Sequence, residues 1–112
     1  MKKVLVVDDE ELIGELLKNL LDMSGYSPII CKNGNEALLH LDEADVLITD
    51  FNMPGMNGAE LAKIAKQRRS TMPVLIMTGD PDDVPNNHSA NQIIAKPFMI
   101  APFLNWLEKV TK

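Results

Sequence analysis

The chain has 112 residues, 46% of them hydrophobic, and its 11 basic and 16 acidic side chains give a formal net charge of -5. This length and composition predict one globular domain over residues 1–112 and exclude a disordered or fibrous chain. The acidic balance argues against direct nucleic-acid binding. No apolar stretch reaches the roughly 18 residues of a membrane span, and no secretory signal precedes the first acidic residues. The single cysteine, Cys31, excludes an internal disulfide, so we expect a cytoplasmic protein.

Short apolar runs alternate with longer amphipathic ones along the chain, which predicts an α/β fold with a parallel sheet. The apolar runs predict buried strands at residues 4–7, 28–31, 46–49, 74–77 and 93–95. A helix is predicted over 12–21, where pairs of leucine or isoleucine recur every four residues as one stripe. Further helices are predicted around 36–41, from 61 to about 69, and over 103–110. The order is that of five βα units.

One connection departs from this pattern. Residues 79–90 include Pro81 and Pro85 and offer only Val84 and Ala90 as apolar positions. A crossover between parallel strands needs about a dozen residues or more, so this segment is just long enough to return the chain. We therefore predict that the fourth helix is missing or reduced to about one turn.

Chemically reactive side chains follow four of the five predicted strands. Asp8 and Asp9 follow the first strand, Asp50 the third, Thr78 the fourth and Lys96 the fifth. Ligands of open parallel sheets bind outside the carboxyl ends of the strands. Three carboxylates at one rim repel one another unless a cation joins them, and Mg²⁺ is the natural candidate because it prefers oxygen ligands. With Lys96 the cation balances the three negative charges, which favours phosphoryl chemistry.

These residues, together with the segment 50–58 (DFNMPGMNG), resemble the receiver domains of two-component response regulators, in particular CheY-like, stand-alone receivers. The resemblance covers nearly the whole chain. It implies a flavodoxin-like, doubly wound, five-stranded parallel sheet in the order 2-1-3-4-5, here with the fourth helix missing or very short. The strand order comes from the resemblance and not from the periodicity.

The resemblance also implies a role for each residue at the rim. Asp50 would be the phosphoacceptor, taking a phosphoryl group from a phosphohistidine on a histidine kinase or a histidine phosphotransfer protein. Asp9, the Asp50 carboxylate and the backbone carbonyl of Asn52 would bind Mg²⁺ directly, and Asp8 would act mainly through a metal-bound water. Such a domain is a phosphoacceptor that assists its own modification, not an enzyme with a separate turnover substrate.

Lys96 would pair with Asp50 and then with a phosphoryl oxygen, while the Thr78 hydroxyl would bind another. Phosphorylation adds about -1.5 to -2 charge and three acceptor oxygens, enough to shift a pre-existing conformational equilibrium. The output would be a contact with a downstream protein or, if the chain is part of a longer protein, with a neighbouring domain.

Two departures from the family pattern bear on how the signal is read. Ile93 stands three positions before Lys96, where the family usually has an aromatic switch residue, and the fourth helix usually contributes to the signalling face. Both favour an alternative function, a phosphorylation-independent interaction module on the same fold. The presence of Asp50, Thr78 and Lys96 argues against it.

A second alternative is an enzyme of the haloacid dehalogenase type, which also combines a nucleophilic aspartate, a hydroxyl, a lysine and Mg²⁺. That family carries Asp-x-Asp on its first strand, whereas Asp50 follows the third strand and lies in Asp-Phe-Asn. A flavin site is also disfavoured, because the acidic residues 8–10 stand where a phosphate-binding loop would lie.

The last predicted helix has more large apolar residues than one narrow stripe buries, Trp106 among them. Two interpretations remain open: Trp106 covers sheet left exposed by the short connection, or it belongs to a partner or homodimer surface. Cys31 is predicted to be a small core residue, and His40 and His88 to lie at the surface.

Overall fold

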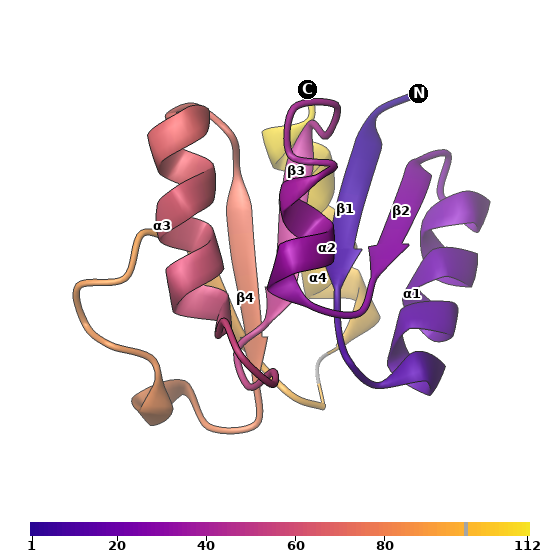
Figure 1. The fold of residues 1–112 in the computed structure, drawn as a ribbon. Coiled ribbons are helices and arrows are strands. Elements are labelled where there is room, and N and C mark those ends of the chain that lie inside the picture. The colour runs from indigo at the N-terminus through magenta and orange to yellow at the C-terminus, as the bar shows by residue number, and fades with distance from the viewer. Residues whose placement is uncertain (98) are drawn as a thin grey trace.

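Five parallel strands form one sheet in residues 1–97 and 99–112, the part of the chain that the computed structural model describes (Figure 1). Their order is β2-β1-β3-β4-β5 and every pairing is parallel, which confirms the predicted flavodoxin-like arrangement. The strands are β1 (Lys3–Val7), β2 (Ser27–Cys31), β3 (Val46–Asp50), β4 (Val74–Thr78) and β5 (Gln92–Ala95). All five carboxyl ends therefore point to one rim of the sheet.

Helices cover both faces of this sheet, as Figure 1 shows. The helices are α1 (Glu11–Met23), α2 (Gly34–Leu38), α3 (Gly58–Arg68) and α4 (Ile100–Val110). Leu5 and Val7 of β1 pack in the cluster under α2 and α3, whereas Val4 and Val6 pack in the cluster under α1 and α4. Because successive side chains of a strand alternate between faces, a strand buried on both must be apolar throughout. No helix in the described part of the chain is long and apolar enough to cross a bilayer.

The connection between β4 and β5 contains only the single 3₁₀ turn η1 (Pro81–Asp83), which confirms that the fourth helix is reduced to a turn. The Asp80 carboxylate begins this turn by accepting a hydrogen bond from the Asp82 N–H at 3.0 Å. Val84 then enters the core and is 5% exposed. Val84, with Ala90 packed against the same cluster, anchors a segment that is otherwise too polar to pack as a helix.

Helix α2 differs from the prediction in its position. The pattern predicted a helix around 36–41, but α2 is Gly34–Leu38 and the chain continues in turns. The reason is local: the Asn33 side chain accepts a hydrogen bond from the Glu36 N–H at 2.8 Å and so begins the helix earlier. Periodicity located the apolar residues but not the capping residue.

The helix predicted over 12–21 is confirmed as α1, but only part of its apolar stripe is buried. Leu17 and Leu21 are buried against the sheet, but Leu12 is 80% and Leu16 61% exposed. A helix packed on one face of a sheet buries only the residues turned toward that sheet. The remaining apolar residues of α1 therefore belong to a surface.

The structure places Trp106, for which two interpretations were open, and Cys31, which was predicted to lie in the core. Trp106 is partly buried and packs against the cluster under α1 and α4, which favours its role as a cover for the sheet. Homodimerisation through this helix stays a prediction. Cys31 is fully buried, and burial, with Glu36 nearby, raises the pKa of its thiol to about 12, so it is a core residue as predicted.

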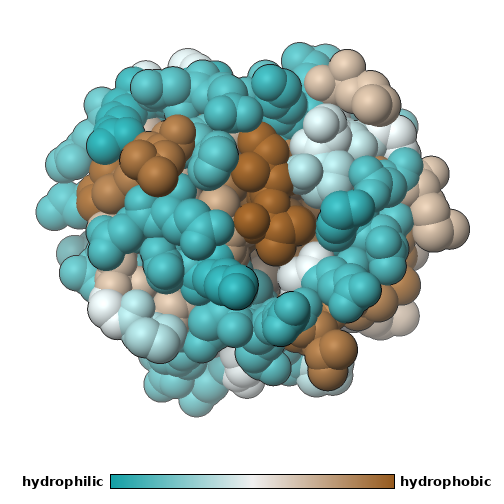
Figure 2. All heavy atoms as spheres, turned by 45° about the vertical axis from the view of Figure 1, so that its right-hand side comes forward, coloured by the Kyte–Doolittle hydropathy of each residue, from teal (hydrophilic) through white to brown (hydrophobic). Residues whose placement is uncertain are grey.

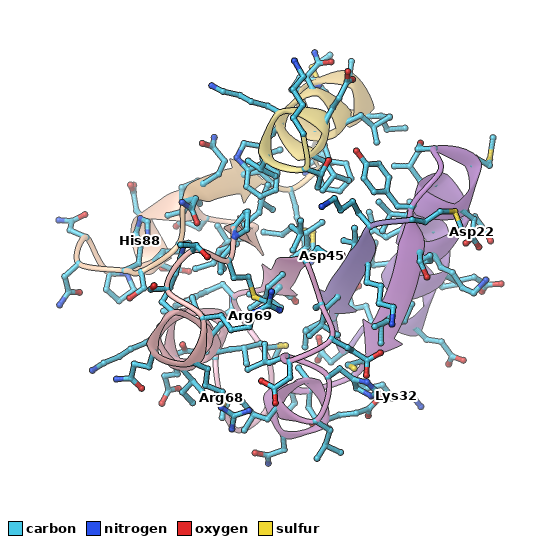
Figure 3. All side chains as sticks on the ribbon, turned by 90° about the horizontal axis from the view of Figure 1, so that it is seen from above. Asp22, Lys32, Asp45, Arg68, Arg69 and His88 are labelled. Carbon is cyan, nitrogen blue, oxygen red and sulfur yellow. The ribbon has the colours of Figure 1, made fainter. Side chains whose placement is uncertain are left out.

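The end of the sheet opposite the carboxyl ends carries structural contacts. Figure 3 shows this end from above, with Arg68 and Arg69 labelled at the end of α3. The Arg68 guanidinium donates to the Leu38 carbonyl at 3.1 Å, and that of Arg69 donates to the carbonyls of Leu41 (2.9 Å) and Ala44. Arg68 thus satisfies the last carbonyl of α2, and Arg69 satisfies two carbonyls of the turns between α2 and β3, which ties this segment to the end of α3.

Candidate functional site

The charged side chains predicted to act together come from the ends of three strands, and Thr78 ends a fourth, β4. Asp8 follows β1, Asp50 is the last residue of β3, and Lys96 follows β5. The backbone fixes two of these positions directly: the Asp8 N–H donates to the Cys31 carbonyl at 3.0 Å, and the Lys96 N–H donates to the Thr78 carbonyl at 2.7 Å. The parallel ladder therefore delivers these side chains to one rim.

Lys96 is the centre of the charge cluster. Its Nζ lies 3.1 Å from Asp50 Oδ1, 3.3 Å from Asp8 Oδ2 and 4.0 Å from Glu10 Oε1. The side chains of Asp8 and Asp50 are 0% and 7% exposed, and that of Lys96 is 20% exposed. The second carboxylate oxygen of Asp8 accepts the Glu10 N–H at 2.9 Å, so both oxygens of this buried group are used.

The charges at the site change the pKa values of two groups. Burial raises the pKa of the Asp50 carboxyl; the hydrogen bond from Lys96 opposes this, and the charges of Asp8 and Asp9 add to it. Burial by itself lowers the pKa of Lys96, but the hydrogen bonds and charges of Asp50 and Asp8 outweigh it, and the pKa is raised. Burial and the two neighbouring carboxylates thus outweigh the single ammonium group in their effect on the pKa of Asp50.

Asp8, Asp9 and Asp50 form a triad typical of a Mg²⁺ site. One carboxylate oxygen from each lies within 4.8 Å of the others. Oxygens on opposite sides of Mg²⁺ lie about 4.2 Å apart, so three carboxylates at this spacing fit a small, hard cation after a slight inward shift or through water.

The other two predicted site residues are placed differently. The Thr78 hydroxyl is buried and donates to the Asp80 carbonyl at 3.1 Å while accepting the Asp80 N–H at 3.2 Å. Asn52 is exposed in the turn after β3. The structure therefore brings Asp8, Asp9, Asp50 and Lys96 together, but it turns the hydroxyl of Thr78 toward its own loop.

The sequence reasoning missed three residues at this site. Glu10 extends the acidic rim toward α1, and Thr49 hydrogen-bonds the carbonyl of Asp50. Gly58 lies so close to the Asp50 carbonyl that a Cβ atom there would run into it and would lie 2.9 Å from the Phe51 Cα. For Glu10 the signal was its place in the acidic run, and for Gly58 its place at the end of a turn. For Thr49 no local signal separates a buried hydroxyl from an ordinary strand threonine.

A parallel five-stranded sheet in this order, with three carboxylates and a lysine at the carboxyl rim, defines a phosphoryl-accepting signalling fold, and comparison with known proteins agrees. Residues 4–108 match the response regulator receiver domain model, so the chain belongs to this family. It is 35% identical over 103 residues to the transcriptional regulatory protein CpxR of Klebsiella pneumoniae, covering 88% of this chain and 44% of that protein. It is 34% identical over 103 residues to the alkaline phosphatase synthesis transcriptional regulatory protein PhoP of Bacillus subtilis, covering 87% and 43%.

Among solved structures, the chain is similar to the response regulator TrrA from Thermotoga maritima in complex with Mg²⁺ and BeF. The TM-score is 0.91 with 31% sequence identity, covering 98% of this chain and 99% of that one. The chain spans less than half the length of the curated relatives it matches. The chain is thus a receiver domain of two-component response regulators with an acidic pocket for phosphorylation. As a member of this family it is a phosphoacceptor rather than a conventional enzyme. Receiver domains interact with histidine kinases.

Proposed function

We propose that Asp50 accepts a phosphoryl group from a phosphohistidine of a histidine kinase or histidine phosphotransfer protein. The observation that carries this proposal is the buried Asp50 carboxylate, held 3.1 Å from Lys96 Nζ within the acidic triad. Asp9, Asp50 and the Asn52 carbonyl would hold Mg²⁺ directly, and Asp8 would act mainly through a water on the metal. Bound Mg²⁺ supplies positive charge for the oxygens of the transferred group.

The transfer exchanges one bond to phosphorus for another. An Asp50 carboxylate oxygen forms the new O–P bond, the P–N bond to the donor histidine breaks, and its electron pair stays on the imidazole, which takes up a proton. Lys96 is already hydrogen-bonded to the Asp50 carboxylate, so it is within reach of an oxygen of the phosphoryl group once that group is attached to Asp50. Its raised pKa keeps it charged through the reaction, so it stabilises the charge that develops on these oxygens.

Thr78 carries the response to phosphorylation. Its hydroxyl leaves the Asp80 backbone groups and binds a phosphoryl oxygen, which pulls on the segment that follows β4. This segment holds only a 3₁₀ turn, and Ile93 is aliphatic, so the signal is read from the segment's own position and not from a swinging ring. In this proposal residues 1–112 are a single cytoplasmic receiver domain whose output is a contact with a downstream protein or neighbouring domain.

The first test is intact mass after incubation with acetyl phosphate and Mg²⁺. Wild type should gain one phosphoryl group, about 80 Da, and Asp50→Asn should gain none, because the amide lacks the nucleophilic oxygen. Adding a chelator should abolish the adduct on wild type. If neither acetyl phosphate nor a panel of phosphorylated histidine kinases modifies wild type, the proposal is wrong and the phosphorylation-independent module takes its place.

A groove leads from this site along α1 and gives the phosphohistidine partner a place to bind. It has a volume of about 580 Å³ and is lined on one side by Ile13, Leu16 and Leu20, and on the other by Pro97 and Ile100. Figure 2 shows the neighbouring face, where hydrophobic side chains are exposed in a hollow near the middle; the groove itself lies between α1 and the start of α4, on the sheet face that is turned away in Figure 1.

The groove continues into the phosphorylation site, since Glu10 and Lys96 also line it. Its lining residues on α1 recur every three or four residues, the spacing that accepts the apolar stripe of a partner helix. A helix of the phosphodonor protein lying in this groove therefore reaches Lys96 and Asp50 with one end. This explains why Leu16 stays exposed on a helix that buries Leu17.

Leu16→Glu should slow phosphorylation by a protein donor but not phosphorylation by acetyl phosphate. Transfer from a phosphorylated histidine phosphotransfer protein that modifies wild type should fall about tenfold or more, because burying a leucine contributes about 1.5–3 kcal/mol. Modification by acetyl phosphate should stay unchanged, because this small donor does not use the groove. Leu39→Glu is the matched control, since Leu39 is 79% exposed on α2's side of the sheet and should change neither reaction. Unchanged protein-to-protein transfer in Leu16→Glu would remove the groove from the proposal.

A further inference from the structure

The residue before Asp50 is a fully buried threonine. Thr49 lies on β3 and shares its face of the sheet with Leu47 and Phe51, in the apolar cluster under α2 and α3. A hydroxyl in such surroundings needs a hydrogen-bond partner to avoid a desolvation cost. The partner is the next residue along the chain: Thr49 Oγ1 donates to the carbonyl oxygen of Asp50 at 2.9 Å, and the Met53 sulfur lies 4.0 Å from Thr49 Oγ1.

This hydrogen bond is part of a short network that holds the backbone where β3 ends. The Phe51 N–H donates to the Met77 carbonyl at 2.8 Å, and the Phe51 carbonyl accepts the Gly58 N–H at 2.9 Å. The backbone of Gly58 also lies against the Asp50 carbonyl, with no space for a Cβ atom between them. Both ends of the peptide group between Asp50 and Phe51 are thus held, its oxygen by Thr49 and its N–H by β4.

The orientation of that peptide group determines where the Asp50 carboxylate points. Adjacent strand residues direct their side chains to opposite faces, so the Thr49 side chain does not reach Lys96 or the triad. Any effect of Thr49 on the site therefore acts through the backbone of Asp50. The chain continues from this peptide group through Phe51 to Asn52, whose carbonyl the proposed function assigns to the metal.

We propose that Thr49 is a positioning residue for phosphoryl transfer, whose hydroxyl holds the Asp50 carbonyl and thereby aligns the acceptor carboxylate. This inference rests on the proposed function of Asp50. A displacement of about 1 Å in a reacting group costs about 100-fold in rate, and loss of one hydrogen bond permits a smaller movement, so we expect about a tenfold effect.

The test compares Thr49→Val with Thr49→Ser. Valine keeps the branched shape and removes the hydroxyl, whereas serine keeps the hydroxyl and removes the methyl group. Positioning predicts that Thr49→Val is phosphorylated by acetyl phosphate about tenfold more slowly at saturating Mg²⁺, while Thr49→Ser stays within about threefold of wild type. A role in packing alone predicts the reverse order, because serine leaves a cavity and valine does not.

A second readout needs neither metal nor phosphate. Amide hydrogen exchange at Phe51 and Gly58, measured by NMR on the metal-free protein, should speed up in Thr49→Val and stay near wild type in Thr49→Ser. If Thr49→Val does not fold, Thr49→Ala and Thr49→Ser form the matched pair, because both lack the methyl group and only one has the hydroxyl. The serine variant should then be phosphorylated about tenfold faster than the alanine variant.

The inference is overturned if Thr49→Val is phosphorylated as fast as wild type, or if Thr49→Ser is as slow as Thr49→Val. Failure of the underlying function gives a different result: wild type itself then takes no phosphoryl group from any donor. A phosphorylated wild type with an equally fast valine variant leaves Asp50 in place as the acceptor and removes only the role of Thr49.

Discussion

Lys96→Met should destabilise the metal-free protein by about 3 kcal/mol, and magnesium should restore part of the loss. Removing one partner of a buried ion pair costs about 3–5 kcal/mol because a buried charge is left without compensation. Here two carboxylates depend on one ammonium, and the side chain of Lys96 remains 20% exposed, which puts the cost near the lower end. Mg²⁺ stabilises each folded protein that it binds, so it narrows the gap only by binding Lys96→Met more tightly than wild type, by about 1.4 kcal/mol for each tenfold difference in Kd; without Lys96 the cation meets a more negative site and binds more tightly.

The measurement is urea unfolding of wild type and Lys96→Met at neutral pH, with chelator and with excess Mg²⁺. Lys18→Met is the control: Lys18 lies 3.0 Å from Asp22, as close as Lys96 to Asp50, but both side chains are about half exposed. We expect this variant to lose less than about 1 kcal/mol, with no magnesium dependence of the loss. Equal losses in the two variants would mean that burial does not determine the value of these ion pairs.

The pH dependence of the same experiment follows from Asp50. Its pKa is raised in the folded protein, so the ionised carboxylate costs stability; the cost is absent below the ordinary value of 3.8 and complete above the raised value. Without Lys96 this cost grows, because the hydrogen bond that opposed the shift is gone. The difference between wild type and Lys96→Met should therefore shrink as the pH falls and Asp50 takes up a proton.

Gly58→Ala should have the second large effect, a loss of about 3 kcal/mol together with strongly reduced phosphorylation. The added Cβ would run into the Asp50 carbonyl and lie 2.9 Å from the Phe51 Cα, and neither is a flexible side chain that can turn away. Overpacking commonly costs about 1–3 kcal/mol, and displaced backbone puts this position at the upper end. The chain that must move carries Asp50, so stability and phosphorylation should fall together.

Gly34→Ala is the matched control, because both glycines begin a helix after a capping asparagine. A Cβ at Gly34 would meet the side chain of Met56, with the sulfur nearest at 2.8 Å, and a methionine can change rotamer. We expect a loss below about 1 kcal/mol there, with normal phosphorylation, from thermal unfolding and intact mass. A Gly58→Ala protein as stable as Gly34→Ala would show that the backbone at Asp50 is not rigid.

The fold was predictable to the extent that its elements are local. The runs at 4–7, 46–49 and 74–77 are apolar on both faces and therefore indicate strands in the middle of a parallel sheet, which they are. The segment of residues 79–90 was too polar for a helix and forms only η1. The position of α2 was missed because Asn33 determines where that helix begins, and a capping side chain is not part of the apolar pattern.

The outer stripe of α1 shows a different limit of the pattern. Leu16 and Leu17 are the same residue type at adjacent positions, yet one is 61% exposed and the other is buried. A hydrophobic side chain favours burial, but its hydrophobicity does not indicate whether the sheet of the same chain or another molecule buries it. Only the position of α4 beside α1, which leaves a groove between them, separates the two.

Which side chains the strands deliver to the rim follows from the amino-acid order: two aspartates come after the first strand, Asp50 after the third and Lys96 after the fifth. This holds because strand ends are marked locally, where apolar residues give way to charge. The tertiary structure alone decided that Lys96 lies between Asp8 and Asp50, that the Thr78 hydroxyl faces Asp80, and that Thr49 holds the Asp50 backbone. Those are distances between atoms far apart in the chain or oriented by packing, and they exist only once the sheet has paired and its helices have closed over it.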